Sequence, residues 1–170
     1  MQKQSVIIDL EKITNTCFII MPFRAHFEAE YDRVIRPAVE EVGLECVRGD
    51  EIYTKQAIIQ DIWYSIRKAR IIIAELSGRN PNVMYEIGLA HAIGKTIILL
   101  TRNQDDVPFD LKSLRYLFYD PDNPFWGDDL RSELVKMLQG VLSSPSLQTH
   151  LESIEINTTL PESPTRKETV

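Results

Sequence analysis

Short runs of nearly continuous apolar residues alternate along this chain with segments whose apolar residues recur at helical spacing. The apolar runs span residues 16–23, 44–52, 70–76, 95–101 and 114–120. Strands that read as continuous apolar runs are buried on both faces, and strands that alternate with helices usually form parallel sheets. The pattern therefore predicts an α/β fold, with a mainly parallel sheet covered by helices on both faces.

The segments between these runs predict amphipathic helices. Apolar residues from Phe27 to Val42 follow the helical spacing, but Pro37 should kink or split that helix, and Gly43 should end it. Further helices are expected at residues 57–69, between residues 77 and 94, and at residues 128–142.

The chain has 170 residues, which is enough for one domain with a proper core. Residues 1–15 are mixed in composition and are expected to form a short N-terminal lead-in segment before the domain. Residues 143–170 are rich in Ser, Thr, Pro and Glu and read as a flexible tail. The folded domain is therefore expected at residues 16–142.

The formal net charge of −6 argues against nucleic acid or an anionic membrane as the main partner. No apolar run approaches the roughly 18 residues that a membrane-spanning helix needs. Cys17 and Cys46 each lie in an apolar, strand-like run. The sequence is compatible with a disulfide between them and with two reduced thiols. No secretory segment is recognisable, which favours reduced thiols in a cytoplasmic protein.

In an open parallel sheet, ligands bind beyond the carboxyl ends of the strands. Three loops leave such ends here, at residues 22–27, 48–54 and 77–82. For Asn80 and Asn82, capping of the following helix is as good an explanation as ligand binding. The candidate ligand-binding residues in these loops are Pro22, Phe23, Arg24, Arg48, Asp50, Ser77, Asn80 and Asn82.

Glu86 is the principal candidate for chemistry. It lies among hydrophobic residues in the first two turns of its helix, where the helix dipole favours an ionised carboxylate. An ion pair with Arg79 or Arg48 is the structural alternative. A carboxylate beside a strand-end crevice is typical of functional acids, so we favour a ligand-facing Glu86. The second candidate acid is Asp61, which interrupts an apolar run in the preceding helix.

Several familiar motifs are missing from the sequence. There is no glycine-rich phosphate loop, no H-E-x-x-H, no paired Cys-x-x-Cys and no G-x-S-x-G. The histidines are scattered, at His26, His91 and His150. No metal and no cofactor are therefore expected. The remaining candidate chemistry is that of carboxylates in a crevice of the size of a nucleotide.

Residues 16–120 resemble a bacterial group of small Rossmann-like proteins related to nucleoside 2-deoxyribosyltransferases and, more distantly, to TIR-type domains. The resemblance lies in "CFIIMPF", "RPAVEEVGLECVRGDEI", "PFDLKSLRYLFYD" and above all "NPNVMYEIGLAHA". It implies a flavodoxin-like, three-layer fold with a five-stranded sheet and a pocket for a nucleoside or a nucleotide such as NAD. It also implies a homo-oligomer, and a role in bacterial signalling or phage defence.

Members of this group with known activity cleave an N-glycosidic bond. Their catalytic glutamate, in the helix after the third strand, falls on Glu86, and an aspartate that handles the proton of the base falls on Asp61. An ionised carboxylate suits the oxocarbenium character that develops on the sugar, and a protonated Asp61 would suit the leaving base. Asn80 or Asn82 would hold a ribose hydroxyl.

Two departures from the transferases bear on the reaction. Asn80 stands about where they carry a further acid, and their first-strand tyrosine has no match here. Glu75 stands where relatives often have aspartate, and we expect it to support its loop. Hydrolysis of NAD or another nucleotide is therefore favoured over deoxyribosyl transfer. A nucleotide-binding sensor without turnover is the alternative.

Overall fold

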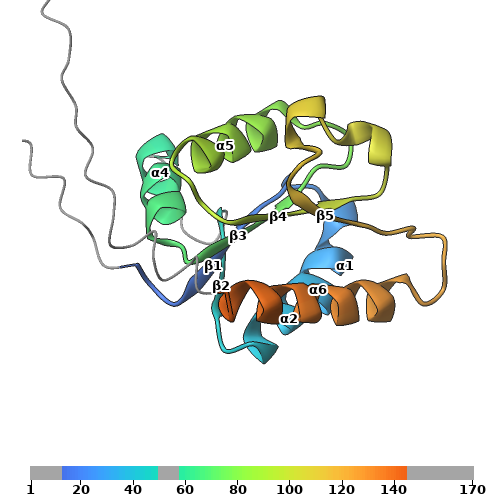
Figure 1. Ribbon diagram of the computed structural model, residues 1–170. Helices are drawn as coiled ribbons and strands as arrows, with labels where there is room; N and C mark the ends of the chain where they lie inside the picture. The colour runs from blue at the N-terminus through green and yellow to red at the C-terminus, as the bar shows by residue number, and fades with distance from the viewer. Residues whose placement is uncertain (1–12, 50–57, 145–170) are drawn as a thin grey trace, which may run out of the picture.

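The computed structural model describes residues 13–49 and 58–144, which form three layers with a parallel sheet in the middle (Figure 1). The strands pair in the order β2-β1-β3-β4-β5, and every pairing is parallel. This confirms the predicted α/β fold and gives the strand order of flavodoxin-like proteins. The strands are β1 (Thr16–Ile20), β2 (Glu45–Arg48), β3 (Ile71–Glu75), β4 (Ile97–Thr101) and β5 (Arg115–Phe118).

Helices cover both faces of the sheet (Figure 1). One face carries α4 (Ile58–Lys68) and α5 (Pro81–Ala92). Two short 3-10 turns, η3 (Gln104–Asp106) and η4 (Phe109–Leu111), lie between β4 and β5. The other face carries η1 (Ala25–Phe27), α1 (Glu28–Glu30), η2 (Tyr31–Ile35), α2 (Arg36–Glu41) and α6 (Trp126–Leu142).

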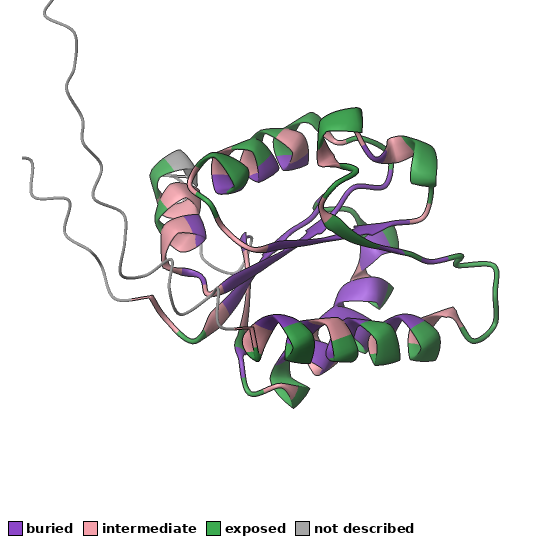
Figure 2. Ribbon diagram, viewed as in Figure 1, coloured by how far each residue is buried: buried purple, intermediate pink, exposed green. Residues whose placement is uncertain are grey.

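Two hydrophobic cores lie on the two sides of the sheet. Because successive side chains of a strand point to opposite faces, Cys17 and Ile19 of β1 pack toward α2 and α6. Phe18 and Ile20 pack toward α4 and α5. Figure 2 shows the same division, with the strands buried and the helices buried on the side that faces the sheet. The sheet is thus a rigid base for the loops at its carboxyl edge.

The first helical segment differs in detail from the prediction of one helix at residues 27–42 that Pro37 kinks or splits. It begins at Ala25 as a 3-10 turn, and a π-helical turn over Tyr31–Ile35 precedes α2. Pro37 is the second residue of α2, and without an N–H it cannot donate to a carbonyl of the π-helical turn before it. The irregular turn therefore comes before the proline. Gly43 follows α2 with a φ of 78°, as a residue that ends a helix does.

Other element boundaries shift by a few residues. The last helix begins at Trp126 instead of residue 128, and β2 ends at Arg48. Residues 1–12, 50–57 and 145–170 lie outside the described residues, so most of the expected lead-in, Asp50 and nearly all of the expected tail lie there. Cys17 and Cys46 are not joined by a disulfide. Among the described residues, no helix has the length and apolar character needed to cross a membrane.

Candidate functional site

A cavity of about 170 Å³ lies at the carboxyl edge of the sheet. Its walls come from the loop after β1, the loop after β3 and the residue that follows β4. Because β2 and β3 lie on opposite sides of β1, this is the point where the strand order reverses, the usual ligand site in such sheets. The lining residues are Pro22, Arg24, His26, Phe27, Ser77, Gly78, Asn80 and Arg102.

The cavity is cationic although the whole chain is acidic. Arg24, His26 and Arg102 line it, and no lining residue is acidic, whereas the chain carries a net charge of −6. The side chain of Arg24 is exposed and forms no hydrogen bond or ion pair within residues 13–49 and 58–144. The site can therefore attract an anionic group.

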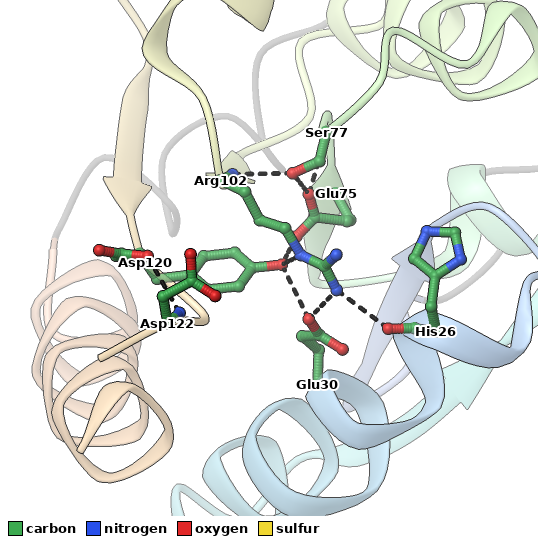
Figure 3. A network of polar contacts seen from close by, with 8 residues as sticks. His26, Glu30, Glu75, Ser77, Arg102, Asp120 and Asp122 are labelled. Carbon is green, nitrogen blue, oxygen red and sulfur yellow. Dashed lines mark hydrogen bonds and ion pairs between the residues drawn. The ribbon is translucent and has the colours of Figure 1, made fainter. Parts of the chain in front are cut away.

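Arg102 is the centre of a polar network beneath the cavity (Figure 3). Its backbone N–H donates to Ser77 Oγ over 2.7 Å, and its Nε donates to the Tyr119 hydroxyl over 3.1 Å. Its Nη2 donates to the His26 carbonyl over 3.0 Å and forms an ion pair with Glu30. Burial alone would lower the pKa of Arg102, but Tyr119 and Glu30 raise it, so the guanidinium stays charged.

Glu75 ends β3 inside the same network and is 1% exposed. Its Oε1 accepts hydrogen bonds from the Ser77 N–H over 2.9 Å and from Ser77 Oγ. Its Oε2 accepts from the Tyr119 hydroxyl over 2.9 Å. Burial raises the pKa of Glu75 to about 7, although these hydrogen bonds and Arg102 act in the opposite direction. Glu75 thus holds the loop after β3, as the sequence predicts.

Glu30 of α1 is the second buried acid of the network, at 2% exposed. Its Oε1 faces Arg102 and also lies 3.4 Å from the Tyr119 hydroxyl. Its Oε2 is buried and has no hydrogen-bond partner in the part of the chain that the structure describes. Two carboxyl groups therefore share one arginine and one tyrosine directly below the cavity.

Glu86 lies away from the cavity, in the second turn of α5. It is half-buried on α5, six residues after Asn80, which places it about 9 Å further along the helix axis. It does not line the cavity. Desolvation raises the pKa of Glu86 to about 7, and among the described residues its carboxyl has no hydrogen-bond or ion-pair partner.

The ion pairs that could have explained Glu86 structurally are formed with other acids. Arg79 Nε lies 3.3 Å from Asp106 Oδ1, and Arg48 Nη1 lies 3.0 Å from Glu28 Oε2. The expected alternative, an ion pair between Glu86 and either arginine, is therefore wrong. The carboxyl of Glu86 is not neutralised in that way.

Asp61 lies in the first turn of α4 and is half-buried. α4 and α5 are neighbouring helices on one face of the sheet (Figure 1). Asp61 lies in the first turn of α4 and Glu86 in the second turn of α5. Asp61 does not line the cavity. The structure thus places both predicted acids on the same face, outside the cationic cavity.

The other predicted ligand-binding residues divide into two groups. Pro22, Arg24, Ser77 and Asn80 meet in the cavity. Asn80 is also the N-cap of α5, because its Oδ1 accepts from Asn82 N over 2.9 Å and from Val83 N over 3.4 Å. The residues that do not line the cavity are the exposed Phe23 and Asn82, Arg48 on β2, and Asp50, which lies outside the described residues.

His26, Phe27 and Gly78 line the cavity and were not predicted as ligand-binding residues, although they lie in the loops that were considered. Three side chains of the polar network were also not predicted from the sequence: Arg102, Glu30 and Tyr119. Arg102 directly follows the apolar run at residues 95–101, so it occupies a strand end like the three loops that were considered. Glu30 lies three residues after Phe27, on the apolar side of a predicted helix, and an acid at that position is a signal of burial. Tyr119 lies in an apolar run and carries no comparable signal.

Within the described ranges, no group of three or more His, Cys, Asp or Glu side chains could hold a metal ion. No model of a known protein family matches the chain, and no curated protein matches it in sequence. The chemistry of the site therefore has to be inferred from its own residues and contacts.

Proposed function

We propose that this protein hydrolyses the N-glycosidic bond of a nucleotide or nucleoside, NAD being one such substrate, with Glu86 as the principal carboxylate. The observation that supports this proposal most directly is that Glu86 is half-buried and that its carboxyl has no hydrogen-bond or ion-pair partner within the described residues. Burial of a carboxyl group without a partner is unfavourable for folding, so its presence favours a role toward a ligand. The resemblance of residues 80–92 to the transferase group supports the same role.

Glu86 would act on the anomeric carbon of the sugar. When the bond between this carbon and the base breaks, its electron pair leaves with the base and positive charge develops on the sugar. An ionised Glu86 stabilises that charge or captures the carbon covalently. Water then bonds to the carbon and gives up a proton to the solvent. Where Glu86 had bonded to the carbon, that bond breaks and its electron pair returns to the carboxylate. A nicotinamide leaving group departs neutral, whereas a purine or pyrimidine needs a proton, which Asp61 would supply.

The raised pKa of Glu86 predicts the pH dependence of turnover. With a pKa of about 7 the carboxyl is mostly protonated below that pH and ionised above it. Because the reaction needs the ionised form, turnover should rise as the pH increases from 5 to 8, with a midpoint about 7. A rate that is constant over this range would contradict an ionised Glu86 as the reacting group.

The experiment is an NMR or chromatographic assay of base release from NAD and from a panel of nucleosides and nucleotides. Wild type is compared with Glu86→Gln and with Glu133→Gln, which changes an exposed acid of α6. We expect Glu86→Gln to lose about 100-fold or more in rate and Glu133→Gln to match wild type. Absence of base release by wild type, or equal release by Glu86→Gln, would overturn the proposal.

A second function is a nucleotide sensor without turnover. The observation that favours it is that neither Glu86 nor Asp61 lines the cavity. Ligand binding that survives Glu86→Gln, together with no base release, would support the sensor. In either role we propose a homo-oligomer that serves bacterial signalling or phage defence, and sedimentation of the purified protein tests the assembly.

A further inference from the structure

We infer that the cavity beyond β1 and β3 selects a phosphate-bearing ligand, and that Arg24 and the free terminal nitrogen of Arg102 hold the phosphate. That the ligand is a nucleotide rests on the proposed function. The anion site itself rests only on the cavity and its charges.

The first support is the position of the positive charge. Arg24 and Arg102 line one cavity of about 170 Å³, and no acidic side chain lines it. Elsewhere acids outnumber bases, since the chain has 25 acidic residues and 19 lysines and arginines. A phosphate dianion would be attracted to the two arginines at this edge of the sheet, although the chain as a whole carries a net negative charge.

The second support is the way Arg102 is held. Its Nε and Nη2 donate to Tyr119, His26 and Glu30, whereas Nη1 has no partner among the described residues. Figure 3 shows the guanidinium enclosed by Glu75, Glu30 and His26, so its orientation is fixed before a ligand arrives. A guanidinium that is held in place and keeps one terminal nitrogen available can donate hydrogen bonds to a phosphate oxygen.

The third support is that most backbone amides of the loop after β3 and of the first turn of α5 are already used. Asn82 N and Val83 N donate to Asn80, Gly78 N donates to Asp106, and Ser77 N donates to Glu75. The first turn of α5 is therefore satisfied by its own cap and does not supply an anion site by itself. On this side of the cavity the phosphate would therefore be held by side chains, which makes the site testable by substitution.

The fourth support is the size of the cavity. Pockets that enclose a whole drug-sized ligand measure about 300–1,000 Å³, and this cavity is smaller. The ring of Phe27, which could have stacked on a base, has the Arg102 guanidinium 4.5 Å from its centre. The cavity thus suits a compact charged group, with the sugar and base outside it and along α5 toward Glu86.

The test compares matched ligands that differ only in the phosphate: nicotinamide mononucleotide against nicotinamide riboside, and AMP against adenosine. Inorganic phosphate and pyrophosphate are titrated as well, all by NMR and calorimetry at low salt. The variant is Arg24→Gln, whose exposed side chain has no partner within the described residues, and the control is the equally exposed Arg33→Gln. Arg102→Lys, which keeps the charge but loses the planar fork, is the second variant.

We expect wild type to bind the phosphorylated member of each pair at least about tenfold more tightly. Arg24→Gln and Arg102→Lys should lose most of this preference, and Arg33→Gln should keep it. Equal affinity for both members of a pair, or a preference that Arg24→Gln leaves intact, would overturn the inference.

The outcomes also separate this inference from the proposed glycosidase. Cleavage of nucleosides without a preference for phosphate would retain the glycosidase and overturn the phosphate site. Binding of phosphate or pyrophosphate that depends on Arg24, without cleavage of any ligand, would retain the phosphate site and overturn the glycosidase. No binding of any of these probes would overturn both.

Discussion

Glu75 at the end of β3 and Glu86 in the second turn of α5 are both withdrawn from water, and burial raises the pKa of each to about 7. Their surroundings differ. Glu75 accepts hydrogen bonds from Ser77 and Tyr119, which fix both of its oxygens. Glu86 has no such partner among the described residues.

The difference teaches that a raised pKa alone does not separate a structural acid from a reactive one. Three donors fix the orientation of Glu75, so any ligand would have to displace them. Glu86 can reorient toward a ligand without breaking a hydrogen bond to the described part of the protein. We therefore assign the structural role to Glu75 and the chemical role to Glu86.

The largest effect that tests this comparison is on stability. Glu75→Ala leaves the Ser77 N–H, the Ser77 hydroxyl and the Tyr119 hydroxyl without their acceptor inside the protein. We expect the free energy of unfolding to fall by about 3–5 kcal/mol. Glu86→Ala should lower it by less than about 1 kcal/mol, because no internal partner is lost. Urea denaturation measures both, and equal losses would break the comparison.

A smaller effect is expected from Tyr119→Phe. The variant removes the hydroxyl that donates to Glu75 and accepts from Arg102, at a cost of about 1–2 kcal/mol. Because the Tyr119 hydrogen bond lowers the pKa of Glu75, its loss should raise that pKa further and leave the pKa of Glu86 unchanged. Carboxyl ¹³C NMR titration measures both groups.

The matched control for that variant is Tyr116→Phe, which changes an exposed tyrosine on β5. It should alter neither the stability nor either pKa. A shift of the Glu86 titration in Tyr119→Phe would show that the two acids are coupled, and would contradict their separate roles.

The smallest effect concerns the stability of Glu86→Gln as a function of pH. The pKa of Glu86 rises from 4.5 to about 7 on folding, so between these values the folded state holds a proton that the unfolded state releases. Wild-type stability should therefore fall as the pH rises from 4.5 to 7.

Glu86→Gln removes this component of the pH dependence, while the similar component from Glu75 remains. The variant should match wild type near pH 4.5 and exceed it at pH 8 by about 1 kcal/mol or less, because a half-buried side chain keeps part of its hydration. Thermal unfolding across this pH range measures the difference. A variant that is less stable than wild type at pH 8 would show that Glu86 has a stabilising partner.

Much of the fold could be predicted from sequence because the apolar patterns are strong. β3 and β4 are buried along their whole length, and both appear in the sequence as unbroken aliphatic runs. The π-helical turn at Tyr31–Ile35 could not be predicted, because its apolar spacing hardly differs from that of an α-helix. Pro37 indicated an irregularity in the segment but not its position.

The candidate site was only partly predictable. The loops after β1 and β3 were expected to meet because parallel strands share a carboxyl edge, and Arg24 and Asn80 do line one cavity. The contact between Arg102 and Glu30 joins residues 72 positions apart, and no local pattern predicts such a pair. Whether Glu86 faces a ligand stays a prediction.

The position of Arg102 also bears on how easily a ligand can bind. Its hydrogen bonds connect the loop after β1 with the end of β4, residues 76 apart in sequence, and others reach Ser77 and Tyr119. The walls of the cavity are therefore ordered when the chain folds, and a ligand loses little additional conformational entropy there. Such a preformed site favours fast binding of a small anion without a conformational change, in contrast to a site whose loops close over the ligand.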